Sequence, residues 1–297
     1  MCNTEDVDAT QTVGKRWSSG LSGEMAVAET TEVSSANPIA VVVQNSHSHR
    51  ELGKAERSQA YTTSYRAMRL VVGVLGIILP ATLIVGEAYF LRGAVQVRGS
   101  LSAYYHTPMR DIFVGALCVI GFMLITYMVG EREASFWVSL VAGIAVLGVT
   151  FFPKTRPGLA DDAPRCGVDP SPIGCSSVQQ ALGESTTAVI HGVFAVIFIL
   201  TLAVLSALFA FSELKISGRR TAGIKDRPKS RFKFAVHATL AALILLAGLY
   251  AFFGFSIWQL TRLYIGEVVG VLAFGASWIV AALPSTAPSR EVPHPDS

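Results

Sequence analysis

Charged side chains are scarce in this sequence. Lys, Arg, Asp and Glu make up 15% of its 297 residues, and hydrophobic residues make up 51%. Charged residues account for about a quarter of an ordinary soluble domain, so this balance excludes a soluble enzyme and a nucleic-acid-binding module. Cysteine is also rare, with four residues, which excludes a secreted domain built around disulfides.

Sequence motifs that bind metals are absent as well. The chain contains no HxxxH, HExxH or CxxC pattern, and these patterns are common signatures of zinc sites. The polar N-terminal segment also lacks the basic and apolar regions of a secretory signal. We therefore predict no cofactor, and zinc enters only through one of the alternatives below.

The apolar residues that replace the missing charges are gathered in six long runs. Apolar runs of about 18 residues or more predict membrane-spanning helices. The runs cover residues 70–91, 112–130, 135–152, 187–211, 234–255 and 264–283. We predict an all-α, polytopic membrane protein with a six-helix transmembrane domain over residues 69–284. Residues 1–68 are predicted to be a disordered cytoplasmic tail, and residues 285–297 a short cytoplasmic tail.

The distribution of Lys and Arg predicts how the chain is oriented. Basic residues are enriched in segments that lie inside if both termini are cytoplasmic, as the positive-inside rule requires. The basic segment 215–233 is then inside, where we expect it to attract anionic inner-leaflet lipid. It carries no motif for nucleic-acid binding. Cys166 and Cys175 fall in an outer, oxidising compartment, so we predict a disulfide between them.

Several titratable residues lie at the same predicted depth, near the outer ends of different spans. Polar groups inside a membrane protein are costly, so each is a candidate functional residue. Taken singly, each also has a structural explanation, such as pairing with a nearby arginine or lying at a helix start. Their shared depth is what indicates a site. These residues are Glu87, His106, Arg110, Asp111, His191 and Glu267.

Three uses of these residues stay open. The first is a non-catalytic, outward-facing polar pocket that binds a lipid headgroup or a small anion. Its candidate ligand-binding residues include Ser102, Tyr105, Arg110 and Glu87. The second is a metal-dependent lipid amidase or esterase, in which His106, Asp111, His191 and Glu267 would hold a zinc ion or act in catalysis. The third is a small proton-coupled transporter with a relay through Glu87, His191 and Glu267.

The last apolar run also contains a GxxxG pattern, formed by Gly266 and Gly270. Small residues at this spacing let two membrane helices approach closely. The partner is either a neighbouring helix of the same bundle or a second copy of the chain in a homo-oligomer, and packing within the bundle is the simpler expectation.

The segment Ser102-Ala-Tyr-Tyr-His-Thr-Pro-Met-Arg-Asp-Ile-Phe-Val-Gly115 resembles an uncharacterised family of bacterial six-span membrane proteins of unknown function. Phe151-Phe-Pro153 and Ala273-Phe-Gly-Ala-Ser-Trp278 support the same resemblance, which covers about residues 70–283. The resemblance implies a fold and no activity.

A looser similarity concerns Ser102, His106 and Asp111. Their order resembles part of the motif set of the alkaline ceramidase and adiponectin-receptor superfamily, whose members are intramembrane zinc hydrolases. That family adds an HxxxH pair from a late helix and usually has seven spans. This chain has Gly266-Glu267 in the corresponding region and six predicted spans. The similarity implies lipid hydrolysis as a hypothesis.

Overall fold

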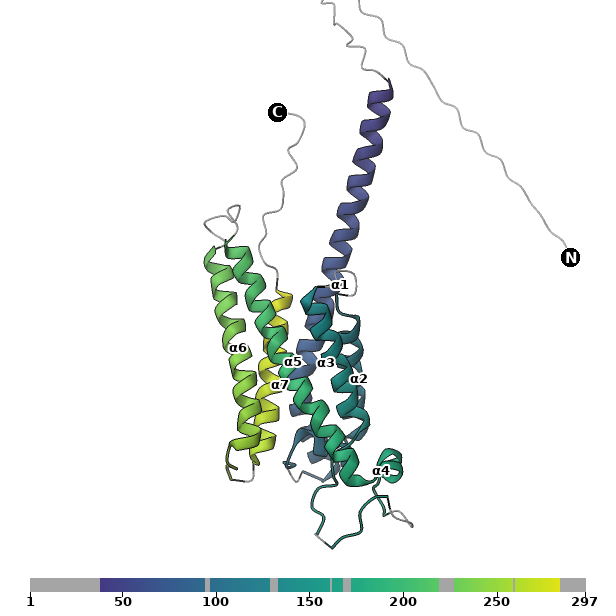
Figure 1. Cartoon of the computed structure of the whole chain (residues 1–297), viewed down its shortest axis with the longest axis vertical. Coiled ribbons are helices and arrows are strands. Elements are labelled where there is room, and N and C mark those ends of the chain that lie inside the picture. The colour runs from purple at the N-terminus through teal and green to yellow at the C-terminus, as the bar shows by residue number, and fades with distance from the viewer. Residues whose placement is uncertain are drawn as a thin grey trace, which may run out of the picture. The chain divides into compact units, whose positions relative to one another are not determined.

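The computed structural model describes residues 38–93, 97–128, 133–160, 162–167, 172–218, 227–258 and 260–283. Within these ranges the chain is helical, and its only β-type pairing is an isolated bridge between Ile257 and Leu260. This confirms the all-α prediction. The elements shown in Figure 1 are α1 (Pro38–Phe90), the short 3-10 helix η1 (Leu101–His106), α2 (Arg110–Thr126), α3 (Ala134–Phe151), α4 (Ser177–Leu182), α5 (Glu184–Gly218), α6 (Arg227–Phe253) and α7 (Arg262–Ala282).

Five of the described helices are long and apolar enough to cross a membrane. They are Thr63–Phe90 within α1, Ala134–Phe151, Glu184–Lys215, Pro228–Phe253 and Arg262–Ala282. Each coincides with one of the predicted runs, because hydropathy reports directly on burial in lipid. The remaining run, 112–130, forms α2, which is shorter at 17 residues. The chain is therefore a multi-pass membrane protein with at least these five spans.

Helix α1 begins much earlier than the sequence predicted. Residues 38–68, assigned to a disordered tail, are helical and continue into the membrane span. Between Pro38 and Pro80 this stretch contains no proline, and a proline is well tolerated in the first turn of a helix. Residues 1–37 lie outside the described part. The chain forms two separate compact units, Met1–Gly53 and Lys54–Ser297, and the membrane-spanning helices belong to the second.

The helices of this unit approach one another closely where small residues meet. A Cβ atom placed on Gly275 of α7 would lie 2.7 Å from the carbonyl oxygen of Gly73 in α1. One placed on Gly266 would lie 2.5 Å from the carbonyl oxygen of Ala247 in α6. Membrane helices associate through such contacts, because lipid supplies no hydrophobic force between them. Gly266 therefore packs within the bundle, while self-association through Gly266 and Gly270 stays a prediction.

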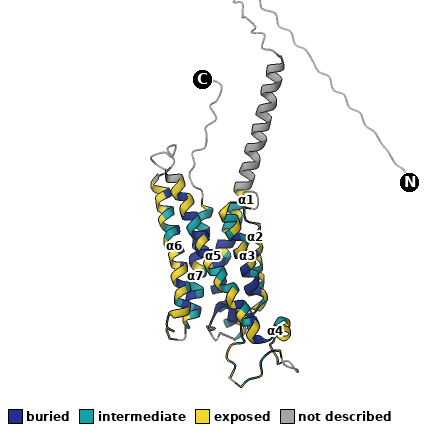
Figure 2. Cartoon of the chain, in the orientation of Figure 1, coloured by how far each residue is buried: buried dark blue, intermediate teal, exposed yellow. Residues whose placement is uncertain are grey.

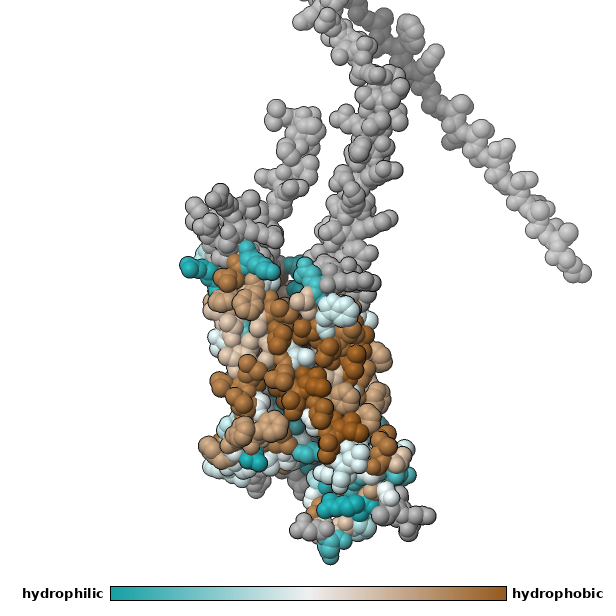
Figure 3. Space-filling view, in the orientation of Figure 1, coloured by the Kyte–Doolittle hydropathy of each residue, from teal (hydrophilic) through white to brown (hydrophobic). Residues whose placement is uncertain are grey.

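Large apolar side chains cover the outside of the helices. In Figure 2 exposed residues run along their outer faces, and in Figure 3 a hydrophobic band lies between two hydrophilic ends. Leu246 is 61% exposed, Phe122 58% and Trp137 56%. Exposed apolar surface of this extent is stable in a bilayer and not in water.

The two ends of the bundle carry different connections. At the end that contains η1 and α4, called the η1 end below, Cys166 and Cys175 form the predicted disulfide, with Cα atoms 5.8 Å apart. At the opposite end, Ser230 Oγ donates to Glu213 Oε2 at 3.0 Å and Lys233 Nζ donates to the carbonyl of Leu283 at 3.1 Å. Residues 219–226 of the basic segment lie outside the described part, so its lipid partner stays a prediction.

Candidate functional site: a lipophilic cavity that contains one carboxylate

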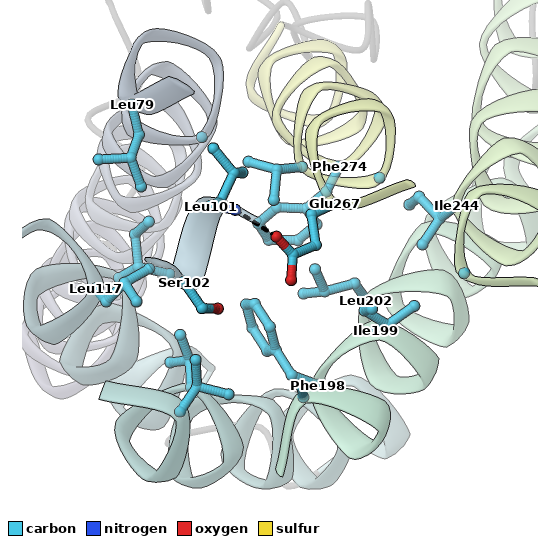
Figure 4. A pocket seen from close by; sticks show the side chains of 18 of the residues that line it. Leu79, Leu101, Ser102, Leu117, Phe198, Ile199, Leu202, Ile244, Glu267 and Phe274 are labelled. Atoms are coloured by element: carbon cyan, nitrogen blue, oxygen red, sulfur yellow. Dashed lines mark hydrogen bonds between the residues drawn. The ribbon is translucent and has the colours of Figure 1, made fainter. Parts of the chain in front are cut away.

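A cavity of about 90 Å³ lies among the helices beside η1. Side chains of α1, α2, α3, α5, α6, α7 and η1 line it, so every long helix contributes (Figure 4). The lining includes Leu79, Leu117, Val149, Phe198, Leu202, Ile244 and Phe274. Only two of its residues, Ser102 and Glu267, carry polar side chains. The cavity therefore suits an apolar group that ends in a polar one.

Glu267 reaches the cavity from the first turns of α7. The Thr261 side chain caps this helix by accepting a hydrogen bond from the backbone N–H of Tyr264 at 3.1 Å. The carboxylate oxygen Oε2 of Glu267 accepts from the backbone N–H of Leu101 at 2.5 Å. Figure 4 shows this bond and shows the other carboxylate oxygen directed into the cavity. One oxygen of Glu267 thus anchors η1, and the other is available to a ligand.

The 3-10 helix η1 is held against α7 at a second point. Thr261 Oγ1 donates to the carbonyl oxygen of Gly99 at 2.5 Å, just before η1 begins. The two attachments bring Ser102 over the cavity, and its hydroxyl points inward (Figure 4). Ser102 is buried from the protein surface. Ser102 and Glu267 are the two sequence candidates that the structure brings together on the cavity.

Glu87 forms an ion pair beside the cavity and does not line it. Arg98 Nε donates to Glu87 Oε1 at 2.8 Å, and its Nη2 contacts the same oxygen. Glu87 is fully buried. Tyr104 lies close by, and burial, helped by the nearby Tyr264 and Glu87, raises the pKa of its phenol to about 12. The phenol is therefore neutral at physiological pH and able to donate a hydrogen bond.

The two candidate histidines both bind backbone carbonyls just after α3. His106 Nε2 lies 2.9 Å from the carbonyl oxygen of Lys154, and His191 Nδ1 lies 2.7 Å from that of Phe152. Gln179 Nε2 donates to the Lys154 carbonyl at 3.0 Å. Burial lowers the pKa of His106 below its ordinary value. Each imidazole therefore uses one nitrogen to hold the backbone of the loop that follows α3.

Arg110 and Asp111 do not face the cavity. Arg110 Nη2 donates to the Tyr105 hydroxyl at 2.8 Å, and its guanidinium carbon lies 4.4 Å from the centre of the Tyr105 ring. Arg110 and Asp111 are both exposed at the start of α2. No group of three His, Cys, Asp or Glu side chains able to hold a metal ion forms among the residues that the structure describes.

Comparisons with known proteins identify no relative. No protein family matches the chain, and neither does any curated protein or solved structure.

Sequence reasoning did not single out the buried ion pairs of this end. It named Glu87 and did not assign Arg98 as its partner, and it did not name Glu184. Glu184 is buried at the start of α5, where its carboxylate pairs with Arg156 at 3.2 Å. Arg98 and Arg156 lie in loops, 11 and 28 residues from their partners in sequence, so no helical i, i+3 or i, i+4 spacing marked the pairs.

Proposed function

We propose that the chain is a six-span membrane protein with both termini in the cytoplasm, and that α2 is the sixth span. A 17-residue helix is about 26 Å long at 1.5 Å per residue, close to the thickness of a bilayer core. Its outward-facing Ile112 and Phe122 are exposed, as lipid-facing residues are. The positive-inside rule places the η1 end outside.

Labelling of single cysteines tests the orientation of the bundle in the membrane. The variants Asp162→Cys and Lys225→Cys, made after Cys2 and Cys118 are changed to Ser, place one thiol in each of two loops. In intact cells, a membrane-impermeant maleimide should label the first and not the second. Labelling of position 225 and not of position 162 from outside would show the opposite orientation, and labelling of both positions from the same side would show that α5 does not cross the membrane.

We further propose that the protein binds a small amphipathic molecule whose polar group donates hydrogen bonds, such as an amine or an alcohol. The observation that carries this proposal is the second carboxylate oxygen of Glu267, which faces an otherwise apolar cavity. A carboxylate in an apolar setting is stabilised by a hydrogen-bond donor, and a charged donor stabilises it more than a neutral one. Ser102 adds a hydroxyl that can donate or accept.

The same geometry supports this proposal over the other functions that the sequence left open. A free anion or a phosphate headgroup would meet the negative charge of Glu267, and no cation is among the lining residues. Metal-dependent hydrolysis needs several ligands in one place, whereas His106 and His191 bind separate loop carbonyls. Ligand binding is therefore the function we infer, with uptake or transport of the ligand as its natural extension.

Three ligands with the same aromatic ring test this proposal: benzylamine, benzyl alcohol and benzoate. An engineered apolar cavity of roughly 150 Å³ holds benzene; the cavity here is smaller, at about 90 Å³, so binding of a ring requires its lining side chains to move apart. Binding to the detergent-purified protein is measured by saturation-transfer NMR against empty micelles. Benzylamine should bind about 10 to 100 times more tightly than benzoate, the effect of one charge-assisted hydrogen bond.

The variant Glu267→Gln should remove most of this preference while leaving the cavity intact. Glu133→Gln is the matched control, because Glu133 is an exposed carboxylate just before α3. It should bind all three probes as the unchanged protein does. Equal binding of benzylamine and benzoate, or a preference that survives Glu267→Gln, would show that Glu267 is not the ligand-binding group.

A further inference from the structure

Three buried polar atoms next to η1 form no hydrogen bond of normal length and angle with the protein, although Ser100 lies within reach of the Glu267 carboxylate and Tyr104 lies within reach of Tyr264. The three atoms are Glu87 Oε2, Ser100 Oγ and Tyr104 Oη, on residues that are 0%, 1% and 0% exposed. In the described part of the chain only five buried side-chain atoms lack such a bond, so three of the five belong to this one region. Buried polar atoms are normally paired, either with protein or with an internal water molecule.

These atoms belong to residues that connect the Glu87–Arg98 ion pair with Glu267. Tyr104 is close enough to Glu87 and Arg98 for both to influence its phenol. Ser100 directly precedes Leu101, whose backbone N–H donates to Glu267, and Ser100 lies beside the Glu267 carboxylate. The group formed by Glu87, Ser100 and Tyr104, called the η1 polar cluster below, therefore reaches Glu267.

The other end of the η1 polar cluster approaches the surface. The Arg98 side chain is 28% exposed, although the Glu87 carboxylate that it binds is fully buried. A route from solution can therefore pass Arg98, enter at the free oxygen of Glu87 and continue along hydroxyl groups to the cavity. Hydroxyls serve such a route well, because each can donate and accept hydrogen bonds.

We propose that the η1 polar cluster holds internal water molecules that connect Glu267 to the solution at the η1 end, and that Glu267 exchanges its proton through them. One proton enters from solution, the hydrogen bonds along the chain reverse, and the carboxylate becomes a neutral carboxylic acid. No other group changes its charge. The proposed ligand is held by the Glu267 carboxylate, so protonation releases an amine from the cavity. This consequence rests on the proposed function.

Few other ionisable groups surround Glu267. Tyr264 lies on α7 itself, Tyr104 lies in η1, and Lys154 acts on Glu267 from the loop after α3. The cavity-lining residues of α1, α2, α3, α5 and α6 carry no ionisable side chain. Proton exchange by Glu267 therefore depends on the η1 side of the cavity.

Infrared spectroscopy of the protein in lipid tests the inference without any ligand. The carboxylic-acid band that disappears in Glu267→Gln is assigned to Glu267. After a change from H2O to D2O this band moves to a lower frequency, and the rate of that change measures proton exchange by Glu267. In the double variant Ser100→Ala, Tyr104→Phe this rate should fall by at least about tenfold, the effect of losing one hydrogen bond on a barrier. The amplitude of the band should be unchanged.

Tyr105→Phe is the matched control. It removes the hydroxyl of the next residue in η1, which binds Arg110 and lies outside the η1 polar cluster. Its exchange rate should equal that of the unchanged protein. Benzyl alcohol binding shows that each variant keeps its cavity, and the single variant Tyr104→Phe replaces the double variant if the latter loses it.

Two results would overturn the inference. One is an exchange rate in Tyr104→Phe and in the double variant within about twofold of the unchanged protein. The other is the absence of any Glu267 carboxylic-acid band from roughly pH 4 to 9, a range that covers the ordinary and the raised pKa of a glutamate. Both leave the benzylamine result untouched, so failure here is distinct from failure of the ligand-binding proposal.

Discussion

The buried carboxylate of Glu184 is expected to hold the loop after α3 to the start of α5. Its Oε1 accepts from the backbone N–H of Arg156 at 2.7 Å, and its Oε2 accepts from the backbone N–H of Cys166 at 3.2 Å. The Arg156 guanidinium donates to both oxygens. We predict that Glu184→Gln, which preserves size and shape, opens this loop.

The size of the effect follows from the donors that surround each oxygen. The amide oxygen of a glutamine can replace Oε1 and keep its contacts with Arg156. The amide NH2 then takes the place of Oε2 and faces two donors, the Cys166 N–H and the Arg156 Nη2 group. Hydrogen bonds to a charged acceptor contribute about 1.5 to 3 kcal/mol each, and breaking a buried ion pair costs about 3 to 5 kcal/mol. We expect the loop to lose about 3 kcal/mol.

Hydrogen–deuterium exchange in lipid nanodiscs measures this loss locally. The backbone amides of Arg156 and Cys166 are the reporters, since both donate to Glu184. A loss of about 3 kcal/mol should speed their exchange on the order of a hundredfold. Asp162→Asn is the control, because it removes the same charge from an exposed position in the same loop. Exchange at both amides within about threefold of the unchanged protein would refute the reasoning.

Three further predictions concern stability. Burial lowers the pKa of His106, so its contribution to folding stability is complete above the unfolded pKa of 6.5 and is lost as the pH falls below that value. Glutamine cannot titrate, so the melting temperature of His106→Gln should fall less between roughly pH 7.5 and 5 than that of the unchanged protein. Gly275→Ala should destabilise the protein by about 1 to 3 kcal/mol in denaturant unfolding, since its Cβ would overlap a carbonyl of α1, whereas Gly115→Ala meets open space and should not. Replacing Cys166 and Cys175 with alanine opens a loop with a sequence separation of 9, and calorimetry should show a loss of about 2 to 3 kcal/mol.

Hydropathy predicted the long helices because burial in lipid depends on each segment's own composition. Five spanning helices coincide with predicted runs, and the Cys166–Cys175 disulfide follows from compartment and loop length. The beginning of α1 at Pro38 was missed, because residues 38–68 are polar. A polar composition is compatible with a disordered tail and with a helix in water, and only helix propensity distinguishes the two.

The site was harder to predict, because a shared depth does not require side chains to meet. Around a bundle of this size, residues at one depth can face lipid, a neighbouring helix or the interior, and the direction depends on helix rotation. Glu267 and Ser102 face the cavity because two hydrogen bonds attach η1 to α7. His106 and His191 turn toward loop carbonyls instead. Both carbonyls belong to a loop whose course depends on contacts between distant residues.

The two buried carboxylates at the η1 end, Glu184 and Glu267, differ in a way that separates structure from function. Glu184 accepts from four donors, and its ion pair leaves no oxygen for a ligand. Glu267 accepts from the backbone N–H of Leu101 and lies beside Ser100 and Ser102, and its other oxygen is directed into an apolar cavity. A carboxylate is costly in such a setting, and the amide oxygen of a glutamine, which has the same length, could accept from Leu101. The negative charge of Glu267 therefore adds nothing that the fold requires, and its value lies in what enters the cavity: a proton or a ligand that donates to it.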